Sequence, residues 1–172
     1  MDEDASKKIS ACAECDSEYN TVTSEMTDLC PECSHILYGY KNCPHHFENG
    51  RCIKCAWDGS ESEYIHKLKE RKLHKSKKIF NVLESLENKY GRTNIVINDH
   101  WEGDREAIGL TDKTRQYLGY ISTYRKEDGT YFLSLENPPS DDKMRFTPAG
   151  EFDNITFADL EKLLIEHLRL TK

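Results

Sequence analysis

The pattern of hydrophobic and polar positions divides the chain into three segments, of which residues 60–92 give the clearest signal. This segment is rich in Lys, Glu and Leu and contains no Pro or Gly before Gly91. In its second half the apolar residues are spaced by four, three and four positions, which is the spacing of one helical face. These residues are Ile79, Leu83, Leu86 and Tyr90. We therefore expect a helical connector, as one helix or as two with a break near residues 74–77, that ends at Gly91.

Residues 93–172 have the pattern of short strands followed by a helix. Stretches rich in β-branched, aromatic and other apolar residues lie at 95–97, 106–110, 118–125 and 130–136. Asp128-Gly129 supplies the positive φ angles of a tight hairpin turn, so the last two stretches should pair as antiparallel strands. Residues 144–146 are a candidate for one more short strand. The pattern predicts an antiparallel sheet of four or five strands.

A helix is predicted at the C-terminal end of this segment. Thr156 and Asp159 have the spacing of a capping box, in which side chains satisfy free N–H groups at the start of a helix. Apolar residues then fall on one helical face, at Phe157, Leu160, Leu164 and Leu168. Together with the strands, this predicts an α+β fold in which the C-terminal helix packs on the sheet.

Residues 1–59 contain little apolar sequence and all seven cysteines of the chain. The first residues lack the apolar core of a signal peptide, and no apolar run is long enough to cross a bilayer. We therefore expect a cytoplasmic protein without a membrane partner. In that reducing compartment an odd number of clustered cysteines indicates metal ligands rather than disulfides. Two tetrahedral zinc sites need eight donors, which seven thiolates and one histidine supply.

The first four cysteines form two C-x2-C pairs that are separated by fourteen residues. They are Cys12, Cys15, Cys30 and Cys33. This is the spacing of a zinc ribbon or treble clef, in which each pair forms a tight turn with backbone N–H groups facing the sulfurs. The pattern resembles small bacterial and phage zinc-ribbon proteins. It predicts one structural zinc ion bound by these four residues.

The second cluster, residues 43–55, reads Cys-Pro-His-His-Phe-Glu-Asn-Gly-Arg-Cys-Ile-Lys-Cys. It resembles the compact C-x-H-x-F-x2-G-x-C-x2-C zinc motif of many small bacterial and phage proteins. The ligands that this resemblance implies are Cys43, His45, Cys52 and Cys55. On spacing alone His46 would complete a C-x2-H pair instead. We favour His45, and the other histidine is then exposed or orients its neighbour.

The eight donors can be paired in two ways. Sequential pairing, with residues 12–33 around one ion and 43–55 around the other, needs only local loops, whereas a cross-braced RING-like arrangement would interleave them. We prefer sequential pairing, because Cys30-x2-Cys33 stands where a RING-like domain has a C-x-H element. Each site then has four protein ligands and no open position for water. The two ions are therefore predicted to be structural, and the protein not to be an enzyme.

Charge bears on whether the partner is a nucleic acid. The formal net charge is −7, with −6 in residues 1–59, +4 in residues 60–92 and −5 in residues 93–172. Acidic segments on both sides of the basic one would oppose a phosphate backbone. The residues that could bind an anion on one helical stripe are Lys67, Arg71, Lys75 and Lys78. A nucleic-acid-binding regulator is the alternative function, and a solvated helix face is the simpler interpretation.

A second candidate surface follows the first predicted strand of residues 93–172. Acidic and polar groups gather there beside a tryptophan, at Asp99, His100, Trp101, Glu102 and Asp104. Such a cluster suits a loop that recognises a partner. A histidine with carboxylates also suits acid–base chemistry, but no nucleophile or phosphate-binding motif accompanies it. An enzyme centred on residues 99–106 is therefore the least favoured function.

The stretches 101–109, 119–124 and 131–132 resemble small bacterial α+β proteins, among them immunity proteins that neutralise toxins. This resemblance implies stoichiometric binding of a protein partner by an acidic surface. The sequence as a whole predicts a two-zinc region at 1–59, a basic helical connector at 60–92 and an α+β domain at 93–172. The predicted function is that of a non-enzymatic protein-interaction module with a regulatory or inhibitory role.

Overall fold

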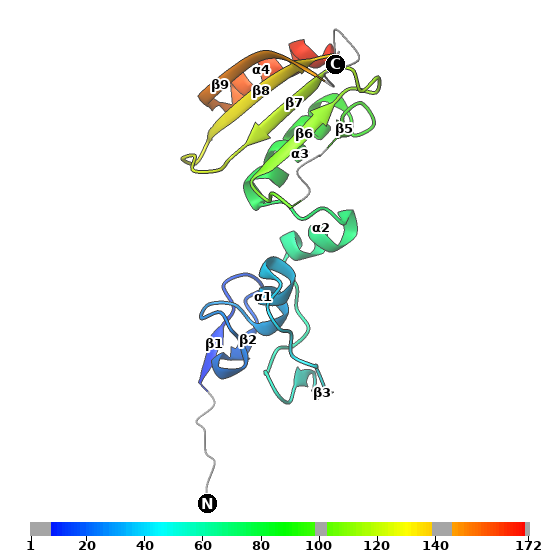
Figure 1. The fold of residues 1–172 in the computed structure, drawn as a ribbon. Coiled ribbons are helices and arrows are strands. Elements are labelled where there is room, and N and C mark those ends of the chain that lie inside the picture. Colours follow the sequence, from blue (N-terminus) through cyan, green and yellow to red (C-terminus); the bar gives the residue numbers. More distant parts are fainter. Residues whose placement is uncertain (1–7, 99–102, 139–145, 171–172) are drawn as a thin grey trace, which may run out of the picture. The chain divides into compact units, whose positions relative to one another are not determined.

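A computed structural model of the chain describes residues 8–98, 103–138 and 146–170. The chain divides into two compact units, Met1–Lys72 and Leu73–Lys172. Helices and antiparallel sheets both occur, so the α+β fold class that the sequence predicts is confirmed (Figure 1). No helix in the described part of the chain is long and apolar enough to cross a membrane.

The first unit is built from short elements that bury little apolar surface. Among its described residues, five of the ten buried apolar side chains are cysteines, so its core consists largely of potential metal ligands. The strands pair as two antiparallel ribbons, β1 with β2 and β3 with β4. The elements are β1 (Ile9–Ala11), β2 (Glu18–Asn20), the 3₁₀ helix η1 (Thr21–Thr23), α1 (Pro31–Tyr38), β3 (Phe47–Glu48), β4 (Arg51–Cys52) and α2 (Glu63–Arg71).

The segment expected as a connector forms two helices, α2 and α3 (Lys77–Tyr90), which contribute to different units. Each begins with a serine N-cap, because the side chains of Ser62 and Ser76 accept hydrogen bonds from backbone N–H groups in the first turn. Lys72 ends α2 in the left-handed conformation. Gly91 ends α3 with a φ angle of 88°, as predicted for the C-cap.

Where the structure describes it, the second unit forms a five-stranded antiparallel sheet with strand order β5-β6-β7-β8-β9 and two long helices. Its elements besides α3 are β5 (Val96–Ile97), β6 (Ala107–Thr111), β7 (Leu118–Ser122), β8 (Thr130–Asn137), β9 (Thr147–Thr156) and α4 (Phe157–Leu168). Because each strand pairs with its neighbour in sequence, the sheet is a simple meander. Helices α3 and α4 cover the same face of this sheet (Figure 1).

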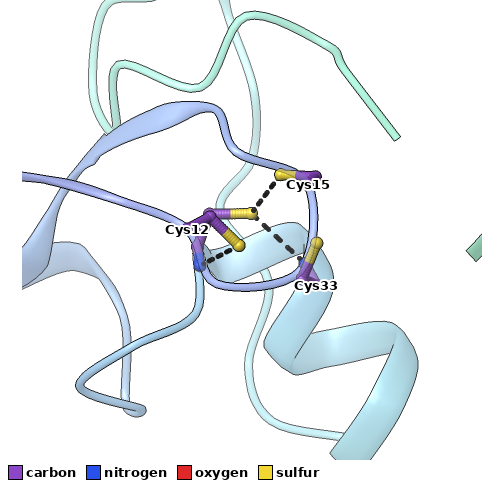
Figure 2. A group of neighbouring side chains, drawn as sticks. Cys12, Cys15 and Cys33 are labelled. Carbon is purple, nitrogen blue, oxygen red and sulfur yellow. Dashed lines mark hydrogen bonds between the residues drawn. The ribbon is translucent and has the colours of Figure 1, made fainter. Parts of the chain in front are cut away.

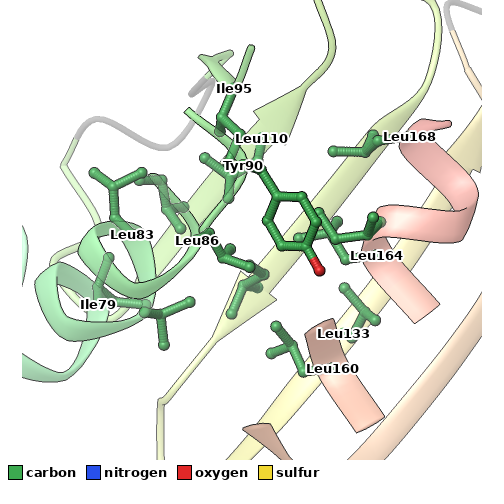
Figure 3. Packing of buried hydrophobic residues seen from close by; sticks show 14 of the residues in the cluster. Ile79, Leu83, Leu86, Tyr90, Ile95, Leu110, Leu133, Leu160, Leu164 and Leu168 are labelled. Carbon is green, nitrogen blue, oxygen red and sulfur yellow. The ribbon is translucent and has the colours of Figure 1, made fainter. Parts of the chain in front are cut away.

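The core of the second unit lies between this sheet face and the two helices (Figure 3). The predicted apolar face of α3 is buried there, as are Leu160, Leu164 and Leu168 of α4. A β-carbon at Gly119 of β7 would lie only 2.1 Å from Cδ1 of Leu164. The missing side chain at this position therefore lets α4 approach the sheet closely.

The hairpin between β7 and β8 is antiparallel as predicted, but its turn differs from the expected one. Strand β7 ends at Ser122, and a seven-residue loop replaces the tight turn expected at Asp128-Gly129. The N–H group of Thr123 donates to the carbonyl of Glu106 and continues the pairing of β7 with β6, and the N–H group of Lys126 then donates to the carbonyl of Thr123 at 3.1 Å. The chain therefore turns first at residues 123–126, where Arg125 takes a positive φ angle of 55°, before it reaches Asp128-Gly129.

Strand β9 is the element that the sequence pattern identified least well. The candidate short strand at 144–146 lies mostly outside the described residues, and the structure has a ten-residue strand directly after it. Pro148 and Gly150 interrupt any alternation in its sequence, which an edge strand tolerates because only one of its sides is paired. Thr156 then caps α4 by accepting a hydrogen bond from the N–H group of Asp159, as predicted.

Candidate metal centres

The first candidate centre consists of the four cysteines of the two C-x2-C pairs. The four Sγ atoms all lie within 4.8 Å of one another, and Cys12, Cys30 and Cys33 are buried. Figure 2 shows Cys12 and Cys15 on one loop and Cys33 on helix α1, with their side chains turned toward a common position. The four sulfurs thus form a single donor set that can hold a metal ion.

Local backbone structure places these sulfurs. Cys30 is the N-cap of α1, and its sulfur accepts a hydrogen bond from the N–H group of Cys33 at 3.4 Å. Pro31 at the first helical position needs no partner for a backbone N–H group. The N–H group of Cys30 donates to Sγ of Cys12 at 3.3 Å. These N–H groups favour the thiolate form of the two sulfurs that accept from them.

The electrostatics of this cluster favour a bound cation. Interactions with Cys12 and Cys15 raise the pKa of the Cys30 and Cys33 thiols well above the ordinary value of 9.0. Four sulfurs this close repel one another when all are ionised, so protons remain on some of them. A metal ion offsets this repulsion because its positive charge stabilises all four thiolates together.

The spacing of the sulfurs fits a tetrahedral ion. A zinc–sulfur bond of about 2.3 Å places the sulfurs of a tetrahedral site about 3.8 Å apart. The Sγ atoms of Cys15 and Cys30 are 3.9 Å apart, and those of Cys43 and Cys52 in the second cluster are also 3.9 Å apart. Both clusters therefore have the size that a zinc ion needs.

The second candidate centre contains Cys43, His45, Cys52 and Cys55, whose donor atoms again lie within 4.8 Å of one another. The β3–β4 hairpin, with Gly50 at a φ angle of 80° in its turn, brings the first half of the motif against the second. The Nδ1 atom of His45 lies 3.4 Å from Sγ of Cys55. The imidazole therefore faces the sulfurs with its δ nitrogen.

The two adjacent histidines differ in exposure and in whether they belong to the donor set. The His45 side chain is 14% exposed and belongs to the donor set, whereas the His46 side chain is 68% exposed. His46 lies on the surface, where its Nε2 atom is 3.9 Å from a carboxylate oxygen of Glu48. The choice of His45 over His46 agrees with this geometry, because His46 is absent from the donor set.

The thiols of the second centre differ in acidity. Burial raises the pKa of Cys52, but hydrogen bonds from the backbone N–H groups of Cys55 and His46 outweigh it and lower the pKa to about 5. Burial raises the pKa of Cys55 to about 12. Cys52 is thus the more acidic of the two thiols, and a bound cation would favour the thiolate form of Cys55 as well.

The donor sets are sequential, with residues 12–33 in one and 43–55 in the other. The expected sequential arrangement is thus present, and the cross-braced one is not. Hydrogen bonds join the two halves of this unit: the N–H group of Asn20 donates to the carbonyl of Cys55 at 2.8 Å, and that of Asp58 donates to Oγ of Ser17 at 3.2 Å.

Sequence reasoning missed the groups that surround His45. The Trp57 ring lies 4.7 Å from the imidazole, and the Phe47 ring lies 5.9 Å from it, measured between ring centroids. A carboxylate oxygen of Glu32 lies 3.5 Å from Nε2 of the same histidine. The positions of Trp57 and Phe47 inside or next to the motif gave a weak signal. Glu32 gave none, because it lies in the other C-x2-C pair.

The four basic residues predicted on one exposed stripe do not form one. Lys67 and Arg71 lie on α2 in the first unit, and Lys78 lies on α3 in the second. Lys75 precedes α3 and is fully buried, with its ammonium donating to the carbonyl of Asp104 at 2.8 Å. Lys67 and Lys78 contact the carboxylates of Glu63 and Asp128. Because its side chain is fully buried, Lys75 is not available to an external anion.

The acidic candidate surface is only partly described. Asp99, His100, Trp101 and Glu102 lie outside the described residues. Asp104 lies within them, where its carbonyl accepts from Lys75 and its carboxylate accepts from the N–H group of Glu106 at 2.9 Å. Asp104 thus makes contacts within its own unit.

The two metal centres are consequently the best-defined sites in the described part of the chain. Each brings four donor atoms together from local sequence motifs, and each has the sulfur spacing of a tetrahedral ion. Comparison with protein-family models, with curated proteins and with solved structures gives no match for this chain.

Proposed function

We propose that this protein binds two structural zinc ions and acts as a non-enzymatic protein-interaction module with a regulatory or inhibitory role. The observation that carries the proposal is the pair of closed four-donor sets in the first unit. Each set supplies every ligand that a tetrahedral ion takes. The ions would therefore hold the fold rather than activate water.

The chemistry of the donors favours zinc over other metals. Seven of the eight donors are thiol sulfurs and the eighth is an imidazole nitrogen. Soft sulfur donors with tetrahedral geometry select zinc or iron–sulfur chemistry, and mixed sulfur–imidazole sets are common for zinc. Oxygen-rich sites would be expected for magnesium or calcium, and neither cluster contains a carboxylate donor.

The distribution of exposed apolar side chains supports a protein partner for the first unit. Six of the eight large apolar side chains that are exposed among the described residues lie in it, although it is the smaller unit. They are Ile9, Val22, Tyr38, Tyr40, Phe47 and Ile53. Residues 1–72 carry nine Lys and Arg against fourteen Asp and Glu. An acidic surface with exposed apolar groups suits a protein partner better than a polyanion.

The zinc part of the proposal is tested by native mass spectrometry of the purified chain, with elemental analysis to identify the metal. We expect two zinc ions per chain. A stoichiometry of one or zero, or iron in place of zinc, would contradict it. Replacing Cys33 or Cys55 by serine should reduce the stoichiometry to one in each case, because each residue belongs to a different donor set.

The partner part is tested by affinity purification of the zinc-loaded chain with nuclease treatment, followed by mass spectrometry. In a Val22→Ser/Ile53→Ser variant we expect two zinc ions and loss of the captured protein, since both side chains are exposed in the first unit. The matched control is Ile97→Ser/Tyr124→Ser, which removes exposed apolar groups from the second unit. Loss of capture in the control alone would place the interaction in the second unit instead.

A further inference from the structure

Glu32 occupies an unusual position between the two metal centres. It lies inside the Cys30-Pro-Glu-Cys33 turn of the first centre, at the start of α1, with its side chain 14% exposed. Its carboxylate is directed at residues outside this turn. One oxygen accepts a hydrogen bond from Nδ2 of Asn42 at 2.6 Å, and the other lies 3.2 Å from Nζ of Lys69 on α2.

The third group facing this carboxylate is a donor of the second centre. Nε2 of His45 lies 3.5 Å from the same Glu32 oxygen that Asn42 contacts. This nitrogen is buried and has no hydrogen-bond partner among the described residues. The other ring nitrogen, Nδ1, faces the sulfur of Cys55. The imidazole therefore stands between the sulfur donors on one side and the Glu32 carboxylate on the other.

From this geometry we infer that Glu32 is the positioning residue for His45 and links occupancy of the second centre to that of the first. A histidine that binds a metal through one nitrogen carries a proton on the other, and a carboxylate facing that proton fixes the ring and increases its basicity. Glu32 supplies this carboxylate from a turn that the first ion fixes. The inference rests on the proposed zinc binding.

The link has a direct structural cause. Glu32 lies between two ligands of the first centre, so a metal bound by Cys30 and Cys33 fixes the backbone from which its side chain extends. Without that ion the turn loses its constraint, and the carboxylate loses its alignment with Nε2 of His45. Filling the first centre should thus increase the zinc affinity of the second.

The first experiment measures zinc affinity by competition with a chromophoric chelator, and follows the ligands by absorption of the Co²⁺-substituted protein. Co²⁺ distinguishes a four-sulfur site from a site with three sulfurs and one nitrogen. Glu32→Ala should weaken the second centre by about 10- to 100-fold and alter its Co²⁺ spectrum. Glu32→Gln keeps an acceptor oxygen, so it should reduce the zinc affinity of the second centre less than Glu32→Ala does. The four-sulfur spectrum of the first centre should not change.

The matched control is Glu48→Gln, because Glu48 faces the exposed His46 at 3.9 Å and makes the same type of pair outside the donor set. We expect no effect on either centre. Equal second-centre affinities in Glu32→Ala and Glu48→Gln would overturn the inference while leaving the zinc proposal intact. Failure of the unmodified chain to bind zinc would instead overturn the proposed function itself.

The link between the centres is tested by a double-mutant cycle in the full chain. Disabling the first centre with Cys12→Ser/Cys15→Ser should lower the zinc affinity of the second centre. In the Glu32→Ala background the same change should cause no further loss, because the connecting side chain is already absent. If the combined variant instead loses zinc affinity at the second centre by the product of the two separate fold-changes, the first centre acts through another route. That result would contradict the inferred role of Glu32.

Discussion

The Nδ1 atom of His45 lies 3.4 Å from the Sγ atom of Cys55, ten residues further along the chain. The backbone explains how the two meet. The N–H group of Ile53 donates to the carbonyl of His46 at 2.9 Å, which closes the β3–β4 hairpin with His45 on its inner side. His46, the next residue, is thereby turned to the solvent.

This arrangement predicts different effects of replacing the two histidines. His45→Ala should remove one of four ligands and weaken zinc binding at the second centre strongly, leaving the four-cysteine centre loaded. His46→Ala should leave both centres loaded, because its ring makes only a surface contact with Glu48. Zinc stoichiometry under increasing chelator concentration gives the comparison. If His46→Ala weakens zinc binding at the second centre more than His45→Ala does, the ligand is His46.

The two units should respond differently to metal removal. Among residues 8–72, half of the buried apolar side chains are cysteines, whereas the described part of the second unit buries leucines, isoleucines and aromatic residues between its sheet and helices. A chelator should therefore collapse the amide dispersion of residues 8–72 in NMR spectra and leave that of residues 73–170 in place. Loss of dispersion in β6, β7 and β8 would mean that the two units unfold together.

Lys75 should be important for the stability of the second unit, although its sequence context suggested an exposed charge. Its side chain is fully buried, and its ammonium bonds to the carbonyl of Asp104. Lys75→Ala leaves a cavity and an unsatisfied carbonyl, so we expect a loss of about 2–4 kcal/mol in urea unfolding followed by amides of the sheet. The exposed neighbour Lys77 is the control, and Lys77→Ala should change stability by less than about 0.5 kcal/mol.

The second unit should become less stable at alkaline pH because of the Tyr90 hydroxyl. Its hydroxyl donates to the Glu161 carboxylate, which together with burial raises the pKa of Tyr90 above its ordinary value of 10.0. A group with a raised pKa in the folded state stabilises fully below its unfolded pKa, and this stability is lost as pH rises through the folded pKa. The second unit should therefore lose stability above about pH 10.

Tyr90→Phe isolates this contribution. The variant should be less stable at pH 7 by about 0.5–1.5 kcal/mol, the usual value of one such hydrogen bond. Its stability should also fall less steeply above pH 10. Some fall remains, because Lys89 contacts the same carboxylate and its pKa is raised by it. Denaturant unfolding across the alkaline range gives the two curves, and identical slopes would contradict the role of the Tyr90 hydroxyl.

The local parts of this structure could be predicted from sequence, because their causes are local. The C-x2-C spacing, the capping box at Thr156 and the apolar face of α3 each lie within a few turns of chain. The contacts that were missed join distant residues. Lys75 is buried and bonds to Asp104, 29 positions away, and Glu32 lies beside His45, thirteen positions away. No local pattern encodes such a pairing, since each residue alone looks like an exposed charge.

Nucleic acid, the alternative partner, should not bind to this protein at physiological salt. Of the four basic residues expected to bind phosphates together, Lys75 is buried, and the others are divided between α2 and α3 in separate units. Three phosphate contacts would give a log–log salt dependence of about −2.7, and the carboxylates at Glu63 and Asp128 already compete for two of these cations.

We therefore expect negligible binding of DNA or RNA at about 0.15 M salt, and unchanged capture of the protein partner by a Lys67→Glu/Arg71→Glu/Lys78→Glu variant. Fluorescence anisotropy with labelled single- and double-stranded probes, measured over a salt series, gives the affinity and its slope. The physical basis is the charge around these residues: residues 1–72 have a net charge of −5 and residues 73–172 of −2, so both units repel a polyanion. A sub-micromolar affinity for DNA or RNA that falls steeply with salt and disappears in the variant would favour a nucleic acid partner over a protein partner. The protein would then be a nucleic-acid-binding regulator, with the zinc centres supporting that surface.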